Sequence, residues 1–391
     1  MSRSLFKVLG LVIGLLFVAV GVGAATSPLG ETGPTSRALQ IGIYDDSEVF
    51  GHPSRAFPQL KQLHTPLLRA NLRWGGLPLA VATRRPENAG DPADPAYNWS
   101  PFDEMLKRAD EANIKVVATI VGTPRWANGG KARYYPPRDM ADLRAFATAA
   151  AKRYSGDYTP EGAEDPLPPI RHWLAWNEPN NPVFLRPQWK RQGKRFVVSS
   201  PVVYAKMCNA IFAGVHSTRI NGEKVACGVT APRGNNRARS IRPSISPLVF
   251  LTALKRNRAR FDVYAHHPYY SGPSETPSTP PKAPTAVTLG NISTLLALLQ
   301  KLYPGKHLWI TEYGYQTNPP DRIFGVSYAK QAKYLAQAVA IVRKKPRVDM
   351  LIWFLLRDDA RIKTGWQSGL VTRPGRKKPA FSTYSRLARR H

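Results

Sequence analysis

Two glutamates in this 391-residue sequence each follow a short apolar run and stand among aromatic residues. The first is Glu178 in the stretch HWLAWNEPNNP, and the second is Glu312 in HLWITEYGYQT. A pair of carboxylates can divide acid–base and nucleophilic work between them, which is the division that cleavage of a glycosidic bond uses. A single glutamate after an apolar strand is as easily a surface residue or an ion-pair partner. The hypothesis therefore depends on a fold that brings the two together.

The elements around these glutamates repeat one pattern: a short apolar strand, a polar loop and an amphipathic helix. Apolar runs predict eight strands, at 39–44, 66–72, 114–121, 171–176, 224–230, 261–266, 307–312 and 348–355. Apolar residues at helical spacing predict helices between them, at 54–64, 100–113, 138–156, 201–216, 247–258, 291–303, 327–344 and 379–390. Continuous apolar strands that alternate with such helices indicate a parallel sheet buried on both faces.

Eight such units predict an α/β fold with a single eight-stranded (β/α)8 barrel. An open doubly wound sheet is the competing fold, but it favours a glycine-rich phosphate loop after its first strand, and IGIYDDSEVFG is not such a loop. In a barrel, catalytic residues lie where strands end. Glu178 follows the fourth predicted strand and Glu312 ends the seventh, so both carboxylates are expected at the barrel mouth.

With these two motifs the chain resembles the retaining glycoside hydrolases of clan A, the superfamily of cellulase-like and β-xylosidase-like barrels. The resemblance rests on WLAWNEPN and WITEYGYQT, in that order, and covers nearly the whole chain after its first residues. It implies that Glu178 is the general acid/base, that Glu312 is the nucleophile and that Asn177 binds the sugar 2-hydroxyl. It also implies a carbohydrate substrate, and neither a metal nor an organic cofactor.

The resemblance extends to residues that would surround the pair. Arg69, in LLRANLRW, would keep the nucleophile ionised, although Arg73 offers the same chemistry. His267 and Tyr269, in AHHPYY, resemble the clan's His-x-Tyr support of the nucleophile, which leaves His266 as a core histidine.

Two tryptophans are expected to bind substrate. Trp353 resembles the eighth-strand aromatic platform under the sugar ring, with a core tryptophan as the alternative, and Trp126 is expected to shape the pocket floor. The proline-rich segment 271–286 is expected to form a long loop near the mouth.

The chain begins with an apparent export signal. Residues 1–25 combine early basic residues, a glycine-broken apolar run and small residues suited to cleavage, which leaves 26–391 as the catalytic barrel. A retained anchor is the alternative, and the favoured location is extracellular or cell-wall associated. Cys208 and Cys227 would lie on a helix and on the following strand, where an oxidising compartment permits a disulfide; two buried thiols are the alternative.

The composition is strongly basic, with 56 Lys and Arg against 26 Asp and Glu and a formal net charge of +30. Two acid-free basic runs, 186–196 and 233–243, follow the fourth and fifth predicted strands and should ring the mouth. They favour an anionic glycan as substrate, unless the bias towards arginine is a general property of the organism's proteins. Alternatives of function are a transglycosylase on the same barrel and a non-catalytic binder of anionic polysaccharide. No nucleic-acid-binding motif is recognisable, and the oligomeric state is open.

Overall fold

Eight parallel strands form the centre of the computed structural model, which describes residues 39–389. They are β1 (Gln40–Tyr44), β2 (Leu67–Arg73), β3 (Lys115–Val121), β4 (His172–Ala175), β7 (Lys224–Thr230), β8 (Val263–His266), β9 (His307–Tyr313) and β10 (Val348–Phe354). Hydrogen bonding follows the order β1-β10-β9-β8-β7-β4-β3-β2 and closes the sheet into a barrel. The predicted (β/α)8 barrel is confirmed, and each predicted strand is present. The predicted export signal, 1–25, lies outside the described residues.

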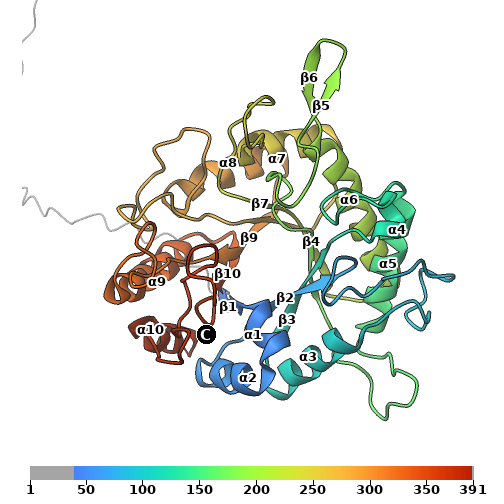
Figure 1. Cartoon of the computed structure of the whole chain (residues 1–391), viewed down its shortest axis with the longest axis horizontal. Coiled ribbons are helices and arrows are strands. Elements are labelled where there is room, and N and C mark those ends of the chain that lie inside the picture. Colours follow the sequence, from blue (N-terminus) through green and yellow to red (C-terminus); the bar gives the residue numbers. More distant parts are fainter. Residues whose placement is uncertain (1–38, 390–391) are drawn as a thin grey trace, which may run out of the picture. The chain divides into compact units, whose positions relative to one another are not determined.

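Helices surround the barrel, as Figure 1 shows. They are α1 (Asp46–Gly51), α2 (Pro53–Gln62), α3 (Ser100–Glu111), α4 (Arg125–Asn128), α5 (Met140–Arg153), α6 (Ser200–Val215), α7 (Pro247–Arg256), α8 (Ile292–Leu302), α9 (Tyr328–Arg343) and α10 (Pro379–Ala388), with 3-10 turns at His216–Thr218 and Leu289–Asn291. Their sequences explain their ends: in α5 the carboxylate of Asp139 caps the first turn by accepting from Ala141 N, at 2.8 Å. None of the helices in 39–389 combines the length and apolarity that crossing a membrane requires.

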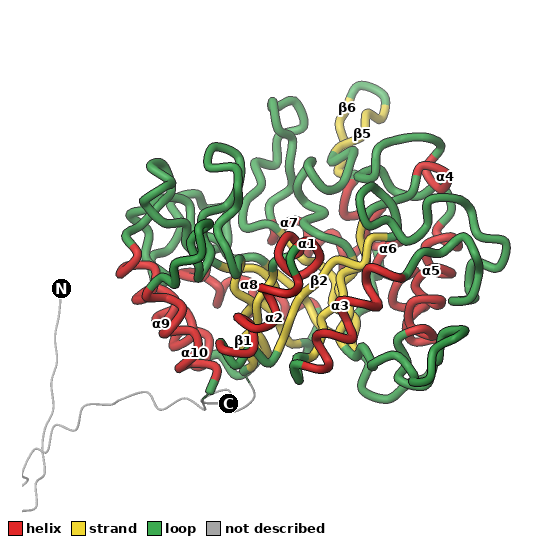
Figure 2. Tube along the Cα trace, turned by 60° about the horizontal axis from the view of Figure 1, so that its bottom comes forward, coloured by secondary structure: helices red, strands yellow, loops and turns green. Residues whose placement is uncertain are grey.

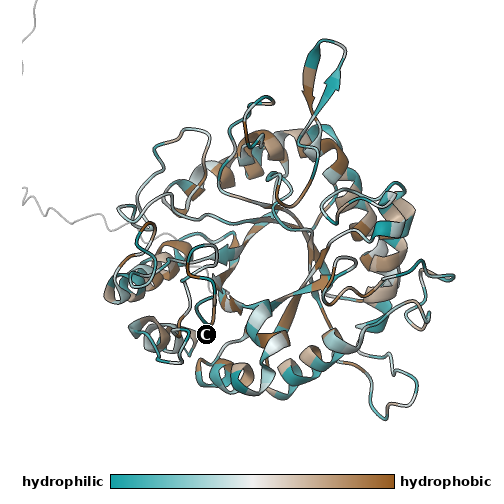
Figure 3. Cartoon of the chain, in the orientation of Figure 1, coloured by the Kyte–Doolittle hydropathy of each residue, from teal (hydrophilic) through white to brown (hydrophobic). Residues whose placement is uncertain are grey.

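Two apolar layers hold the barrel together. Inside the barrel, alternate strand residues pack against one another, among them Leu67, Val117, Leu174, Trp309 and Ile352. A larger layer fills the space between the strands and the helices. Both hydrophobic and hydrophilic colours appear along the surrounding helices in Figure 3, as expected for helices with one buried face.

Long loops gather at one end of the barrel, where Figure 2 shows them together with a two-stranded hairpin. The hairpin consists of β5 (Trp189–Gln192) and β6 (Arg195–Val198), which pair antiparallel within the basic run 186–196. It was not predicted, because its residues are mostly exposed and lack the apolar run of a barrel strand. This end carries the loops that follow the strands, so it is the end where a barrel enzyme places its site.

Candidate active site

Glu178 lies three residues beyond β4, on a backbone that turns sharply. Trp176 and Glu178 both have positive φ angles, +72° and +38°, which non-glycine residues rarely adopt. The amide of Glu178 donates to the carbonyl of Val229 on the adjacent strand β7, at 2.9 Å. The chain is therefore held against its neighbour while the carboxyl is directed into the mouth, a kind of local strain that is frequent at functional sites.

Glu312 reaches the mouth through a bulge in β9. Ile310 pairs with Leu351 and Tyr313 with Trp353, so β9 takes three steps where β10 takes two. One extra residue at Thr311 and Glu312 lets both side chains contribute to the site. Bulges of this kind re-aim side chains beside active sites.

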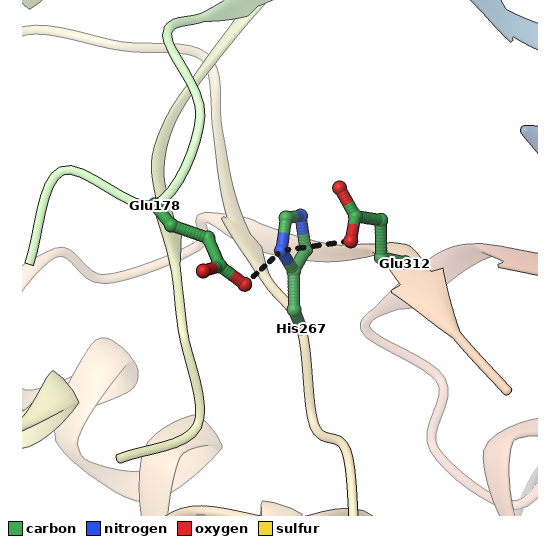
Figure 4. A group of neighbouring side chains, drawn as sticks. All are labelled: Glu178, His267 and Glu312. Atoms are coloured by element: carbon green, nitrogen blue, oxygen red, sulfur yellow. Dashed lines mark hydrogen bonds and ion pairs between the residues drawn. The ribbon is translucent and has the colours of Figure 1, made fainter. Parts of the chain in front are cut away.

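The two carboxylates converge around one histidine (Figure 4). Glu178, His267 and Glu312 each present an atom within 4.8 Å of the others. His267 Nδ1 lies 3.1 Å from Glu178 Oε1 and 3.7 Å from Glu312 Oε2. Both carboxyls are largely buried, with side-chain exposures of 12% and 10%.

Arg69 is fully buried and binds Glu312. Its guanidinium donates to Glu312 Oε1 and to Asn177 Oδ1, both at 2.7 Å, and further bonds go to Thr119 and to the Thr311 carbonyl. The alternative that the sequence left open, Arg73, instead pairs with Asp46 at 3.2 Å. Arg69 therefore provides the cation beside Glu312 and orients Asn177 at the same time.

The partners of His267 determine its tautomer. Nε2 lies 3.0 Å from the Thr311 hydroxyl and 3.4 Å from Arg69 Nη1, and a guanidinium only donates. Nε2 therefore accepts, and Nδ1 carries the proton and donates to Glu178. Burial lowers the pKa of His267 to about 3, so the ring is neutral near pH 7. A neutral donor fixes the position of Glu178 without adding a charge that would ionise it.

Glu178 and Glu312 have different surroundings. Burial raises the pKa of Glu178 above its ordinary value, and the hydrogen bond from Asn181 Nδ2 to Oε2, at 3.0 Å, opposes that rise. Glu312 instead accepts from Arg69 and from the Tyr269 hydroxyl, the latter at 3.2 Å. A carboxyl whose pKa is raised by burial thus faces one that is bound to a cation, the usual arrangement of an acid and a nucleophile.

A cleft of about 940 Å³ opens over the pair, near the upper end of the range of roughly 300–1,000 Å³ that is usual for ligand sites. Its lining includes Glu178, Glu312, Asn177 and Tyr269 together with residues that the sequence did not single out: Tyr44, Asn71, Arg133, Asn181, Phe354 and Trp366. The sequence could have indicated two of these, since Tyr44 is the last residue of the first barrel strand and Phe354 the last residue of the eighth. The proline-rich loop also contributes, through Ala283, Thr285 and Ala286.

The prediction that Trp353 forms the sugar platform is wrong. Its side chain is fully buried, donates to the Ser368 carbonyl at 3.0 Å and packs in the layer between strands and helices. Successive strand residues point to opposite faces, and Met350 and Ile352 occupy the barrel interior. The inward position nearest the mouth is therefore Phe354, which lines the cleft.

Trp126 also lies away from the cleft lining. It packs edge-on against Trp74, its indole nitrogen donates to the Ala82 carbonyl at 3.1 Å, and Arg85 covers its ring at 4.6 Å. The loop after β3 instead reaches the cleft through Val121, Gly122 and Arg133. Trp126 therefore supports this loop from behind.

Three further residues were predicted. His266 is a core histidine, bonded to Thr230 Oγ1 at 2.8 Å and to the Val287 carbonyl at 3.0 Å. A disulfide joins Cys208 on α6 to Cys227 on β7, with Cα atoms 6.1 Å apart. The bridge fastens a helix to the strand that follows it in the barrel.

The two basic runs differ in their relation to the cleft. From 233–243, Arg233 and Arg242 line it. The run 186–196 has no residue in the lining and forms the projecting hairpin, where Arg239 of the other run covers the Phe196 ring at 5.6 Å. Of the two basic runs, only 233–243, in the loop after β7, therefore contributes arginines to the cleft.

Glu178, His267 and Glu312 are also the combination of groups that a metal ion uses. However, the Arg69 guanidinium already bonds Glu312 and lies against Nε2 of His267, and its charge opposes a second cation there. The donor set therefore suits proton transfer and nucleophilic attack better than metal binding.

No model of a protein family matches the sequence, and no curated protein matches it. Solved structures match it in fold. A family 39 glycoside hydrolase from the gut symbiont Bacteroides cellulosilyticus WH2 has a TM-score of 0.62 at 16% identity, over 90% of this chain and 64% of that chain. A glucosidase from Croceicoccus marinus has a TM-score of 0.63 at 16% identity, over 91% and 68%. A fungal β-1,4-galactanase has a TM-score of 0.54 at 14% identity, over 89% and 99%.

At such identities the likeness concerns the fold. This chain spans less than two thirds of the length of the family 39 hydrolase, at 64%, and almost the whole of the galactanase, at 99%. The barrel described above is thus an arrangement that glycoside hydrolases of several kinds share.

Proposed function

We propose that this protein is a retaining glycoside hydrolase, with Glu312 as nucleophile and Glu178 as general acid/base. The observation that carries the proposal is the closeness of the two carboxylates: an oxygen of Glu178 lies within 4.8 Å of an oxygen of Glu312. Retaining enzymes hold their carboxyl groups about 5–5.5 Å apart and inverting enzymes about 6.5–9.5 Å, so contact this close favours the retaining arrangement. The same convergence argues against a non-catalytic polysaccharide binder, which has no need of it.

In the proposed reaction, Glu312 attacks the anomeric carbon while the glycosidic C–O bond breaks and Glu178 gives its proton to the departing oxygen. Asn177, held by Arg69, binds the sugar 2-hydroxyl. In the second step the Glu178 carboxylate takes a proton from water, whose oxygen attacks the anomeric carbon and releases Glu312. Both glutamates end in the protonation state in which they began.

We further propose that the substrate is an anionic glycan and that the enzyme acts outside the cytoplasm. Support for the first comes from the net charge of +30 and from Arg133, Arg233 and Arg242 along the cleft. Support for the second comes from the signal-like segment 1–25 and from the disulfide, since disulfides persist mainly in oxidising compartments.

The mechanism is tested with two variants and a panel of aryl glycosides. Glu312→Ala should abolish turnover. Glu178→Ala should leave a slow enzyme on substrates with activated leaving groups, and azide should restore its rate and yield a glycosyl azide of retained configuration. An inverted product, or normal activity in Glu312→Ala, would overturn the assignment. Incubating the inactive Glu312→Ala variant with a broad glycan panel would identify the sugar that it binds.

A further inference from the structure

The cleft has two chemically different halves. In the barrel order, β2, β3, β4 and β7 are consecutive, and so are β8, β9, β10 and β1. Each half supplies one catalytic carboxylate: the first supplies Glu178, in the loop after β4, and the second supplies Glu312, on β9.

The half that contains Glu312 is aromatic. Tyr44, Tyr269, Phe354 and Trp366 line it, and their rings form a continuous wall. Ring centroids are 5.2 Å apart for Tyr44 and Phe354, 5.6 Å for Phe354 and Trp366, and 5.0 Å for Trp366 and Tyr269. Such a wall suits the apolar C–H face of a sugar ring.

The half that contains Glu178 is cationic. Its lining includes Arg73, Arg133, Arg233 and Arg242, with Phe184 as its aromatic exception. Arg73 pairs with Asp46, but within residues 39–389 the other three arginines form no ion pair with a carboxylate. Arg233 and Arg242 lie close enough to Glu178 to lower its pKa, against the larger effect of burial.

The proposed reaction places one part of the substrate in each half of the cleft. The sugar that becomes attached to the enzyme must lie over Glu312, and the departing group must lie beside Glu178, which protonates its oxygen. The departing group therefore meets the unpaired arginines. We propose that the enzyme selects its substrate by an oxyanion on the leaving-group side, a carboxylate or sulfate bound by Arg242, Arg233 and Arg133.

This inference rests on the proposed glycosidase function and goes beyond it, because it places the negative charge on the departing part of the substrate. Arg242 is the sharpest probe. Its exposed guanidinium makes no hydrogen bond within the described part of the chain, so its removal should leave the fold intact. Arg233, in contrast, donates to the carbonyl of Tyr270 and also holds the neighbouring loop.

The test uses matched leaving groups on whichever sugar the aryl glycoside panel shows to be turned over. The 4-carboxyphenyl and 4-carbamoylphenyl glycosides are similar in size and differ by one charge. The neutral carbamoyl group withdraws electrons more strongly, so chemistry alone favours the uncharged substrate. The parent enzyme should nevertheless show the higher kcat/KM for the carboxylate at low salt.

Arg242→Ala should lower kcat/KM for the carboxylate by about three- to fivefold, and the double variant with Arg233→Ala by on the order of tenfold. The loss should be smaller on the carbamoyl substrate, so that the ratio of the two kcat/KM values falls. Arg242→Lys should retain most of the preference, because it keeps the charge. Arg237→Ala is the matched control, since it removes the same charge from the same loop outside the cleft lining.

Five results would count against the inference. Equal turnover of both substrates by the parent, a preference that survives loss of both arginines, or equal losses on both substrates would each overturn it while the glycosidase function stands. If Arg237→Ala lowered kcat/KM for the carboxylate as much as Arg242→Ala does, the preference would come from the overall positive charge of the protein and not from the cleft, which would also overturn the inference. Failure to turn over any glycoside in the panel would overturn the proposed function, and the inference with it.

Discussion

The hydrogen bond between Asn181 and Glu178 offers a direct way to move the proton affinity of the proposed acid. Asn181 Nδ2 donates to Glu178 Oε2 at 3.0 Å, and a donor to a carboxylate stabilises its charged form. Burial is the larger influence and raises the pKa of Glu178 above its ordinary value. Replacing Asn181 by Ala leaves burial unopposed by this bond, so the pKa of Glu178 should rise further.

The size of the effect follows from the bond. A hydrogen bond to a charged group contributes about 1.5–3 kcal/mol, and one pKa unit corresponds to about 1.4 kcal/mol. Because the cleft is open and water can replace part of the bond, the lower end applies, and the expected change is about one pH unit. Glu178 must be protonated to act as the acid, so kcat/KM falls on the alkaline side as it ionises. A raised pKa moves this alkaline limb to higher pH.

The assay is kcat/KM against pH on an aryl glycoside whose leaving group needs protonation. Asn181→Asp is the second variant: it keeps the oxygen that accepts from Val183 N, at 3.1 Å, and places a negative charge beside Glu178. Its alkaline limb should move at least as far upward. A 2,4-dinitrophenyl glycoside, which departs without proton transfer, is the control and should show no such movement. An unchanged limb in both variants, or a downward shift, would refute the role of Glu178 as the acid.

Three further predictions concern other parts of the molecule. Replacing Cys208 and Cys227 by Ala should lower the free energy of unfolding by about 3 kcal/mol for a bridge across 19 residues, and reductant should lower the denaturation midpoint of the parent but not of this variant. Tyr269→Phe removes the bond to Glu312 and should lower kcat/KM by roughly tenfold with unchanged thermal stability; an unaltered rate would show that the hydroxyl is dispensable. Burial raises the pKa of Asp45 to about 7, so the folded state binds the extra proton between about pH 4 and 7 and the free energy of unfolding falls as pH rises through that window. Asp45→Asn should flatten this dependence in denaturant titrations, and an identical slope in both proteins would contradict it.

The fold could be predicted because its signal repeats along the chain. Each barrel strand is an apolar run of a few residues, and each is followed by residues with helical periodicity, so errors at single ends did not disturb the count. The run predicted at 307–312 forms β9 (His307–Tyr313), one residue longer. The hairpin β5–β6 escaped prediction because its pairing is local and buries little: Phe196 and Val197 remain 39% exposed.

The sequence predicted which strand ends carry the site, but it did not predict whether a given residue there points into the barrel or towards the helices. Trp353 was chosen for its chemistry, and its neighbour Phe354 occupies the inward position. A shift of one residue along a strand exchanges the two faces. The alternation was available, since Met350 and Ile352 precede Phe354 on the same face, but the unbroken apolar run from Met350 to Phe354 conceals it. Strands buried on both faces read as nearly continuous apolar runs, so the sequence does not show which residues point inward.

The sequence also did not show how far along its strand each residue lies from the barrel mouth. This distance determines which of the two arginines of β2, Arg69 or Arg73, binds Glu312. Arg69 and Arg73 are four residues apart and therefore share a face with Asn71 between them. Side-chain periodicity cannot separate them. In the barrel, Arg69 is level with Tyr44 at the end of β1 and lies beneath the cleft, fully buried, whereas Arg73 stands nearer the mouth and meets Asp46.

The position of Glu312 does not follow from a simple inward–outward alternation of side chains along its strand. Trp309 packs inside the barrel and Thr311 bonds His267, so strict alternation would turn Glu312 outward, towards the helices. The extra residue in β9 instead lets Thr311 and Glu312 both serve the site: the first fixes His267 and accepts from Arg69, and the second receives the other hydrogen bond of the same guanidinium nitrogen. One backbone irregularity thus orients Glu312, the arginine that binds it and the histidine that holds Glu178. The same bulge interrupts the two-residue alternation of side chains on which a sequence-based assignment depends. The sequence therefore predicted that Glu312 lies at the end of its strand, but alternation alone would have pointed its side chain to the wrong face.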